Sequence, residues 1–264
     1  MNILEIIQFA FVQKAFIAGS FVAMLCSILG LFLVLQKMSL IGDGLSHVSF
    51  GAVALGIFFG IYPIYFALPV VALASVLILK LAKKGRLYKD TAIGIVSATG
   101  IAGGVIIASI AGGFNVDLFS YLFGNILAIS NAEVIISIAL SLIVLAIVYF
   151  FYYDLFSITF NEDYAKTTGV KTELINSLLV VLTAITAVLA VKVVGVMLVS
   201  ALLIIPATTA LQFKAGFKAT IFLAAIFSIF SVLAGIILSI ILNIPAGASI
   251  VMISLVLFAI SLLF

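Results

Sequence analysis

The sequence predicts an all-α fold, a polytopic transmembrane helical bundle. Of the 264 residues, 66% are hydrophobic and only 8% are charged, whereas soluble domains contain about 25% charged residues. About nine apolar runs, or eight, are long enough to cross a bilayer. No polar block between them is long enough to fold as a soluble domain. We therefore expect a single transmembrane domain over residues 1–264.

The expected spans follow from the apolar runs and from the turn signals between them. They cover residues 15–35, 39–60, 64–81, 91–110, 133–153, 174–191, 196–212, 219–242 and 249–264. A short interfacial helix is expected within residues 1–14, and an extracytoplasmic loop with a dipping helix over residues 111–131. Residues 192–195 are expected to form a turn, and Pro206 to break the seventh span.

Basic residues predict the orientation. Ten of the twelve lysine and arginine residues fall on one side of the expected spans, and only Lys14 and Lys192 fall on the other. Cytoplasmic loops of membrane proteins are enriched in lysine and arginine. The N-terminus is therefore expected outside and the C-terminus in the cytoplasm. The small net charge of +3 reflects this bias rather than nucleic-acid binding.

Asp43 and His47, in the second expected span, are the leading candidates for function. His47 is the only histidine in the chain, and a spacing of four places both side chains on one helix face. An ionisable group at membrane depth costs roughly 2.5–3.5 kcal/mol and is functional by default. A carboxylate with an imidazole suits Zn²⁺ or Mn²⁺, and the softer zinc favours nitrogen. The alternative is structural: a buried Asp–His hydrogen bond, or a first helical turn still among the headgroups.

Two ligands are too few for a tight metal site, and a two-fold dimer would supply four. Small residues surround the pair, and Gly42, Gly44 and Ser46 let another backbone or an ion approach. Ordinary packing explains each glycine equally well. In the fourth span, Gly100 and Gly104 form a GxxxG pattern that permits close helix approach in lipid.

Residues 154–173 form the longest polar segment. Within it, Asn161 can cap a short helix, and Glu162 and Asp163 suit the positive N-terminal end of that helix. Gly169 can end it. Such a segment is often a plain loop, but its size and its cytoplasmic side also fit a helix that docks on a soluble partner.

Several function classes lack their signatures in this chain. There is no G-x-x-x-x-G-K-[ST] phosphate-binding loop, so the chain is not expected to hydrolyse ATP in the usual way. It has no H-E-x-x-H pattern, and a lone histidine disfavours most hydrolase schemes. Cys26 is the only cysteine, so no internal disulfide can form. These absences disfavour an enzyme of the ATP-hydrolysing or hydrolase classes.

Three stretches resemble the permease subunits of bacterial metal-ion ABC importers, which take up zinc or manganese. They are MSLIGDGLSHVSFGAVALG (38–56), VKVVGVMLVSALLIIPATTA (191–210) and FNEDYAKTTGVK (160–171). Hydropathy matches this family along nearly the whole chain. The first stretch is more similar to the zinc branch than to the manganese branch, because it has a Gly-Leu pair and lacks a proline. Iron also occurs as a substrate in this family.

The resemblance implies a permease that moves Zn²⁺ inward across the bacterial cytoplasmic membrane, with no permanently bound cofactor. Asp43 and His47 would lie on the transport path. The implied partners are a second copy of the chain, cytoplasmic ATP-binding subunits and an extracytoplasmic metal-binding protein. The segment expected to couple to the ATP-binding subunits contains Asn161, Glu162, Asp163, Tyr164, Ala165, Lys166 and Gly169. Roles in packing and gating are expected for Gly42, Gly44, Ser46 and Pro206.

Other functions remain open on the sequence. A manganese or iron permease of the same family is the nearest alternative, followed by a permease for an organic ligand such as a cobalamin or haem. A stand-alone ion channel or secondary transporter would need no ATPase, and the polar segment argues against it. An intramembrane metalloenzyme would need a third ligand and an acid or base beside Asp43 and His47.

Overall fold

The computed structural model describes residues 8–85, 87–113 and 116–263. In that part of the chain every regular element is a helix, which confirms the all-α prediction. The first elements are α2 (Ala10–Leu35), α3 (Ile41–Phe58), α4 (Pro63–Lys84), α5 (Lys89–Ile110), α6 (Val116–Phe123) and η1 (Ile126–Ala128). They are followed by α7 (Asn131–Phe150), α8 (Tyr152–Phe160), α9 (Glu162–Thr167), α10 (Thr172–Val194), η2 (Val196–Leu198), α11 (Val199–Gln212), α12 (Phe217–Leu242) and α13 (Ala246–Ser261).

Seven of these helices are long and apolar enough to cross a membrane: α2, α3, α4, α5, α7, α10 and α12. Two shorter apolar helical stretches, 196–212 and Ala246–Ser261, occupy the positions of the seventh and ninth expected spans. The multi-span prediction is therefore confirmed. The number nine and the direction of the termini remain predictions.

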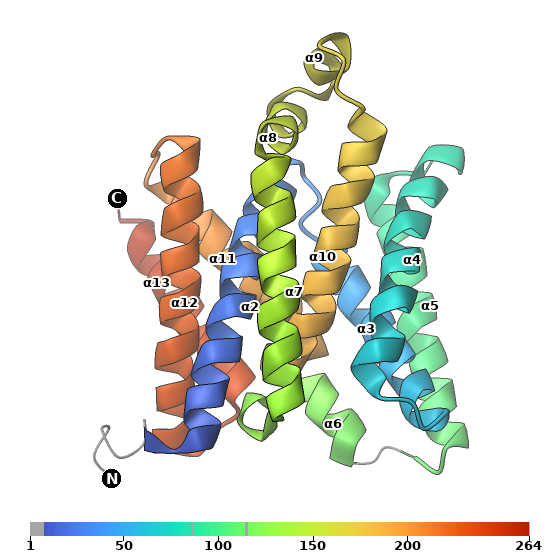
Figure 1. Ribbon diagram of the computed structural model, residues 1–264, viewed down its shortest axis with the longest axis vertical. Coiled ribbons are helices and arrows are strands. Elements are labelled where there is room, and N and C mark those ends of the chain that lie inside the picture. The colour runs from blue at the N-terminus through green and yellow to red at the C-terminus, as the bar shows by residue number, and fades with distance from the viewer. Residues whose placement is uncertain (1–7, 86, 114–115, 264) are drawn as a thin grey trace.

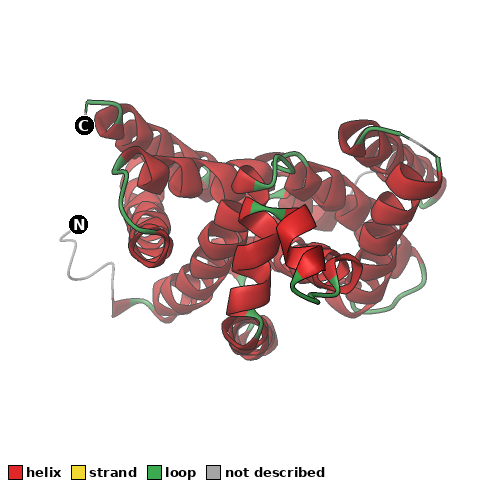
Figure 2. Ribbon diagram, turned by 90° about the horizontal axis from the view of Figure 1, so that it is seen from above, coloured by secondary structure: helices red, strands yellow, loops and turns green. Residues whose placement is uncertain are grey.

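The helices form an elongated bundle when viewed from the α9 end (Figure 2). Helices α2, α3 and α10 are mostly buried within the chain, whereas α4, α5 and α7 leave most of their surface exposed. Helix α2 packs against α12, α11, α10 and α7. Helices α8 and α9 lie at one end of the bundle and α6 lies at the other, where α2 begins (Figure 1). If the orientation predicted from the lysine distribution holds, the α8–α9 end faces the cytoplasm.

Three expected boundaries were wrong. Residues 10–14 belong to α2 and not to a separate interfacial helix, because Val12 and Ala15 continue one buried face; residues 1–7 lie outside the described chain. Helix α10 continues through Lys192 and ends at Gly195, whose φ of 85° is left-handed. Helix α11 runs through Pro206 without a break.

The expected loop at 111–131 does contain short helices, α6 and η1, at the end of the bundle opposite α9 (Figure 1). Its residues 114–115 lie outside the described chain. Gly124, in this segment, has a φ of 75° and packs on the α10 terminus. A Cβ there would lie 2.6 Å from the backbone nitrogen of Gly195, so only a glycine fits this approach.

Helices α3 and α5 approach each other closely at the GxxxG pattern that the sequence singled out. A Cβ on Gly100 would lie 2.6 Å from the Cα of Val48. A Cβ on Gly104 would lie 2.9 Å from the Cα of Gly51, and Gly51 in turn touches the carbonyl oxygen of Gly100. The expectation of close helix approach at Gly100 and Gly104 is therefore confirmed.

A buried ion pair lies at the end of the bundle opposite α9. Lys192 Nζ of α10 lies 3.1 Å from Glu133 Oε1 of α7, with side-chain exposures of 16% and 5%. The same ammonium lies 4.9 Å from the ring centroid of Tyr121, a favourable cation–π distance. Glu133 also completes a capping box with Ser130 at the start of α7. The charge of Lys192 is thus compensated within the protein.

The α3–α5 contact gives a stability prediction. Gly100→Ala is expected to destabilise the fold by roughly 1–3 kcal/mol, because the added methyl group meets the rigid backbone at Val48. Gly103→Ala is the matched control, since a Cβ there meets nothing within 4 Å. The control is expected to be neutral or slightly stabilising. Thermal unfolding of the purified full chain in detergent measures both, and equal melting temperatures would contradict the contact.

Candidate functional site

Asp43 and His47 lie in the most buried helix of the bundle. Between Ile41 and Ala54, they are the only two residues of α3 that retain partial exposure, and every other position there is buried. Their spacing of one helical turn gives them the same face. The single open strip along this part of α3 therefore carries a carboxylate and an imidazole.

A serine of the neighbouring helix orients His47. Its Nδ1 lies 2.7 Å from Ser97 Oγ of α5. In the tautomer with the proton on Nδ1, this nitrogen donates to Ser97 and Nε2 keeps a free lone pair. A ring held through one nitrogen, with the other open, is the usual arrangement of a metal-binding histidine. The close approach at Gly100 and Gly104 brings Ser97 to this distance, because the three residues share one face of α5.

Helix α11 and the short η2 helix approach Asp43 from another side. Ser200 Oγ of α11 lies 3.5 Å from Asp43 Oδ1, at the limit of a hydrogen bond. Ser46 Oγ is fully buried and lies 2.8 Å from the Asp43 carbonyl oxygen and 2.9 Å from that of Val196. Ser46, for which a role in packing or gating was expected, therefore ties α3 to Val196 of η2, within the stretch 191–210 that resembles the permease family.

The two glycines beside the pair lie against large side chains of other helices. A Cβ on Gly44 would lie 2.6 Å from Ile93 Cγ2 of α5. Gly42 meets the side chain of Leu203 of α11, and any Cβ there would overlap it. Pro206 is buried in the same helix, one turn beyond Leu203. Gly42, Gly44 and Ser46 thus lie at the contacts of α3 with α5, α11 and η2.

The pair alone does not complete a metal site. Among the residues that the structure describes, no group of three or more histidine, cysteine, aspartate or glutamate side chains could hold one ion. Within one chain the available donors are the Asp43 carboxylate and His47 Nε2. A four-coordinate zinc site needs more ligands than these two.

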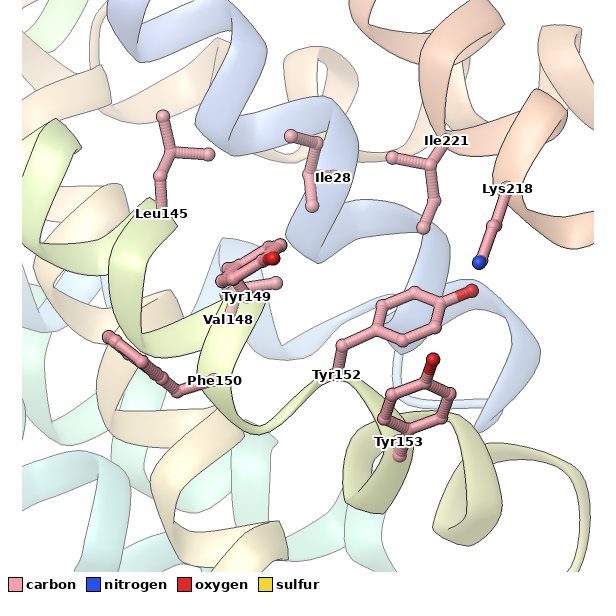
Figure 3. Close-up of a pocket in the computed structure, with 9 residues that line it drawn as sticks. All are labelled: Ile28, Leu145, Val148, Tyr149, Phe150, Tyr152, Tyr153, Lys218 and Ile221. Atoms are coloured by element: carbon pink, nitrogen blue, oxygen red, sulfur yellow. The ribbon is translucent and has the colours of Figure 1, made fainter.

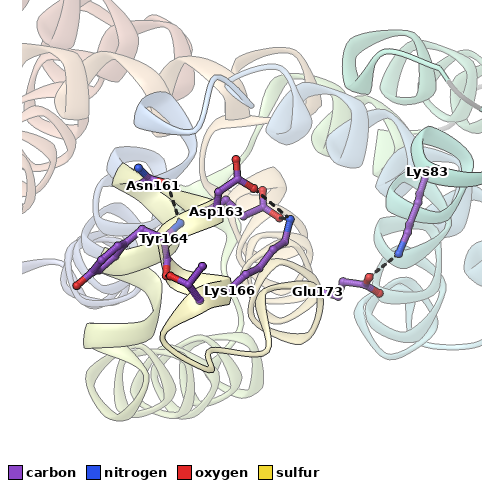
Figure 4. Close-up of polar contacts among 8 residues, drawn as sticks. Lys83, Asn161, Asp163, Tyr164, Lys166 and Glu173 are labelled. Atoms are coloured by element: carbon purple, nitrogen blue, oxygen red, sulfur yellow. Dashed lines mark hydrogen bonds and ion pairs between the residues drawn. The ribbon is translucent and has the colours of Figure 1, made fainter.

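The polar segment 154–173 contains the expected short helix, α9. Asn161 Oδ1 accepts a hydrogen bond of 2.9 Å from the backbone N–H of Tyr164, so the predicted cap of α9 is confirmed. Lys166 Nζ lies 3.4 Å from Glu162 and 3.7 Å from Asp163, along one turn of α9 (Figure 4). These exposed pairs contribute little stability but give α9 a charged outer surface.

One face of helix α9 is exposed, and the other is buried against the rest of the protein. The side chain of Tyr164 is 63% exposed, whereas Ala165 is fully buried. The chain leaves α9 at Gly169, whose φ of 88° is left-handed, as expected for a residue that ends a helix. Beyond it, Glu173 at the start of α10 pairs with Lys83 at the end of α4 (Figure 4).

Aromatic packing connects α9 to the bundle through α8. Phe156 and Phe160 of α8 each contact the ring of Phe217 at the start of α12, with centroid separations of 5.0 and 5.7 Å. Phe217 also contacts Phe32 of α2 at 5.4 Å. These ring contacts join α8, which directly precedes α9, to α12 and α2.

Sequence reasoning missed Ser97 and Ser200. A signal for Ser97 exists, because it precedes Gly100 by three residues on the face that the GxxxG pattern assigns to helix packing. Ser200 lies within the family-like stretch 191–210, but no spacing in the sequence relates it to Asp43. Only the fold brings these positions, 157 residues apart, together.

Comparisons with known proteins find relatives over nearly the whole chain. The chain is 34% identical over 256 residues to the high-affinity zinc uptake system membrane protein ZnuB of Haemophilus influenzae, covering 97% of this chain and 98% of that protein. It is 32% identical over 260 residues to the manganese transport system membrane protein MntC of Halalkalibacterium halodurans, covering 98% and 89%.

A solved structure has the same fold over nearly its whole length. PsaBC from Streptococcus pneumoniae, solved in complex with Fab, has a chain that superposes with a TM-score of 0.89 at 33% identity, covering 98% of this chain and 94% of that one. The model of the ABC 3 transport family matches residues 8–264. The chain therefore belongs to the ABC 3 transport family, which confirms the resemblance to metal-importing permeases.

Proposed function

We propose that this chain is the membrane-spanning permease of an ATP-driven importer that moves Zn²⁺ into the cytoplasm. The observation that carries the proposal is the open strip on α3, where the Asp43 carboxylate and the His47 imidazole are the only partly exposed groups between Ile41 and Ala54. Membership of a transport family supports the permease role. The absence of a phosphate-binding loop from the sequence leaves ATP hydrolysis to a partner chain.

Zinc is proposed as the transported ion because one of the two donors is an imidazole nitrogen. Zn²⁺ binds histidine nitrogen readily, whereas Mn²⁺ favours carboxylate and carbonyl oxygen. Manganese is the second candidate, since relatives of comparable identity are named for manganese transport and for zinc uptake. The same Asp–His pair can serve either ion with different affinity.

We further propose that two chains assemble with their Asp43–His47 strips facing each other. Two donors per chain leave the ion under-coordinated, and a two-fold axis beside the strip adds a second carboxylate and a second imidazole. Leu40, the residue directly before α3, is 52% exposed. Its apolar surface is available to the contact between the two chains.

The outer face of α9 is the proposed contact for the ATP-binding subunit. The helix is capped, carries its charges outward and lies at the extreme end of the bundle (Figure 1). The ring cluster beneath it supports a mechanical role, because it joins α8 to α12 and α2. When ATP binding draws the ATP-binding subunits together, the helices that surround Asp43 and His47 would then shift relative to one another.

His47→Ala is expected to abolish metal uptake while membrane insertion and pairing with the ATP-binding subunits persist. Ser97→Ala keeps the imidazole but removes its orienting partner, and we expect it to weaken metal affinity by about tenfold or more. Both are measured by uptake of radioactive zinc in cells that lack the native copy of the gene.

Ser49→Ala is the matched control. Ser49 is buried in the same helix, and its hydroxyl has no hydrogen-bond partner in the described structure. Uptake is expected to be unchanged in this variant. Full zinc uptake by His47→Ala would overturn the assignment of the site.

Metal binding tests the ion and the dimer together. The purified full chain is expected to bind one Zn²⁺ per two chains, and His47→Ala to bind none at this site. Native mass spectrometry measures both the number of bound Zn²⁺ ions and the number of chains in the assembly. One ion bound to a monomer would contradict the dimer, and growth of a deletion strain restored by manganese alone would contradict zinc.

Tyr164→Ala is expected to weaken co-purification of the ATP-binding subunits, because it truncates the most exposed apolar group of α9. Tyr65→Ala is the matched control: this tyrosine is 58% exposed but lies near the start of α4, at the other end of the bundle. Equal loss in both variants would refute α9 as the contact. Metal transport by the chain alone in liposomes would instead indicate a channel or secondary transporter.

A further inference from the structure

A groove of about 750 Å³ lies on the outside of the bundle where α2, α7, α8 and α12 meet. One part of its wall is aliphatic, with Ile28 of α2, Leu145 of α7 and Ile221 of α12 facing the space (Figure 3). Its volume falls within the range of about 300–1,000 Å³ typical of small-ligand sites. Asp43 and His47 do not line it, so it is separate from the proposed transport path.

The other part of the wall is polar and positively charged. The hydroxyl groups of Tyr152 and Tyr153 and the ammonium group of Lys218 point toward the same region (Figure 3). Lys218 Nζ lies 5.9 Å from the ring centroid of Tyr152. Within the described chain no carboxylate lies within 4 Å of this ammonium. Three tyrosines line the groove, and the hydroxyls of two of them, Tyr152 and Tyr153, lie on the same side as this one uncompensated positive charge.

The surface around the groove is exposed and apolar. Leu142 and Ile143 of α7 are 53% and 54% exposed, and Phe222 and Ile226 of α12 are 67% and 43% exposed. In a multi-pass membrane protein such side chains face acyl chains. Tyrosine and lysine are the residues that anchor a helix at the headgroup level. The groove thus changes from acyl-chain chemistry to headgroup chemistry toward the end that carries α8.

We propose that this groove binds one anionic phospholipid from the leaflet on the α8–α9 side. An acyl chain lies along Ile28, Leu145 and Ile221, and the phosphate accepts hydrogen bonds from Lys218 and the two tyrosine hydroxyls. Basic pockets between transmembrane helices on the cytoplasmic side bind acidic headgroups in this way. The lysine distribution independently assigns this end of the bundle to the cytoplasm.

The proposed lipid site adjoins the aromatic cluster of α8 and α12. The ring of Tyr152 stacks on Phe156 at 6.2 Å and contacts Phe217 at 6.1 Å. Both phenylalanines belong to the ring cluster that joins α8 to α12. A phospholipid in the groove therefore touches the elements at the base of α9.

Native mass spectrometry of the full chain in detergent tests the site, with phosphatidylglycerol and phosphatidylcholine of identical acyl chains as probes. The wild-type chain is expected to retain phosphatidylglycerol in preference. Lys218→Gln is expected to reduce that preference about fivefold, the effect of one basic residue near an acidic headgroup. Lys218→Arg keeps the charge and should keep the preference.

Two further variants make the result specific. Lys214→Gln removes a nearby lysine that does not line the groove, and it should behave as wild type. Ile221→Trp keeps the charge but fills the aliphatic wall, and it should reduce retention of both lipids. Melting temperatures verify that each variant is folded.

Three outcomes would overturn the proposal: equal retention of the two lipids by the wild-type chain, an unchanged preference in Lys218→Gln, or an equal loss in Lys214→Gln. Excess inorganic phosphate separates a lipid site from a phosphate site. Phosphatidylglycerol should remain bound in its presence, because the acyl chain contributes most of the contact. Displacement by phosphate would indicate a simple anion site and contradict the lipid assignment.

Discussion

The site depends on the close approach of α3 and α5. Glycines at the contact bring the two backbones within a separation that no side chain would permit. The nearness of the helices places Ser97 Oγ 2.7 Å from Nδ1 of His47. Packing of small residues, which stabilises helix association in lipid, thereby also brings a hydrogen-bond partner to the only histidine of the sequence. One backbone contact thus supports both the fold and the chemistry.

Much of the fold could be predicted from the sequence because membrane spans are long apolar runs with recognisable ends. All seven long helices coincide with expected spans. The errors arose where local signals competed with packing. Pro206 was expected to break its helix, but α11 continues through it. The hydroxyl groups of Thr208 and Thr209 donate hydrogen bonds to backbone carbonyl oxygens of the preceding turn. In transmembrane helices, side-chain hydroxyls and neighbouring helices satisfy the backbone groups that a proline leaves free. Lys192 reads as a turn residue, but its ion pair lets α10 continue past it.

Two of the four site residues, Asp43 and His47, could be predicted from the sequence, and Ser97 and Ser200 could not. Asp43 and His47 stand out because charge is rare in an apolar run and because a helical period relates them. Ser97 and Ser200 are common residues on other helices, and no periodicity connects them to the pair. Their positions follow from tertiary packing, which composition and spacing do not encode. The cap and the end of α9 were predicted because Asn161 and Gly169 act within a few residues of their own positions.

The Lys192–Glu133 pair has a consequence for the membrane potential. A transmembrane field acts on net charge, at about 2.3 kcal/mol per elementary charge per 100 mV. Lys192 and Glu133 lie 3.1 Å apart and are carried by different helices, so together they present a dipole instead of an isolated cation. Because the two charges cancel, the field exerts almost no net force on this pair of residues.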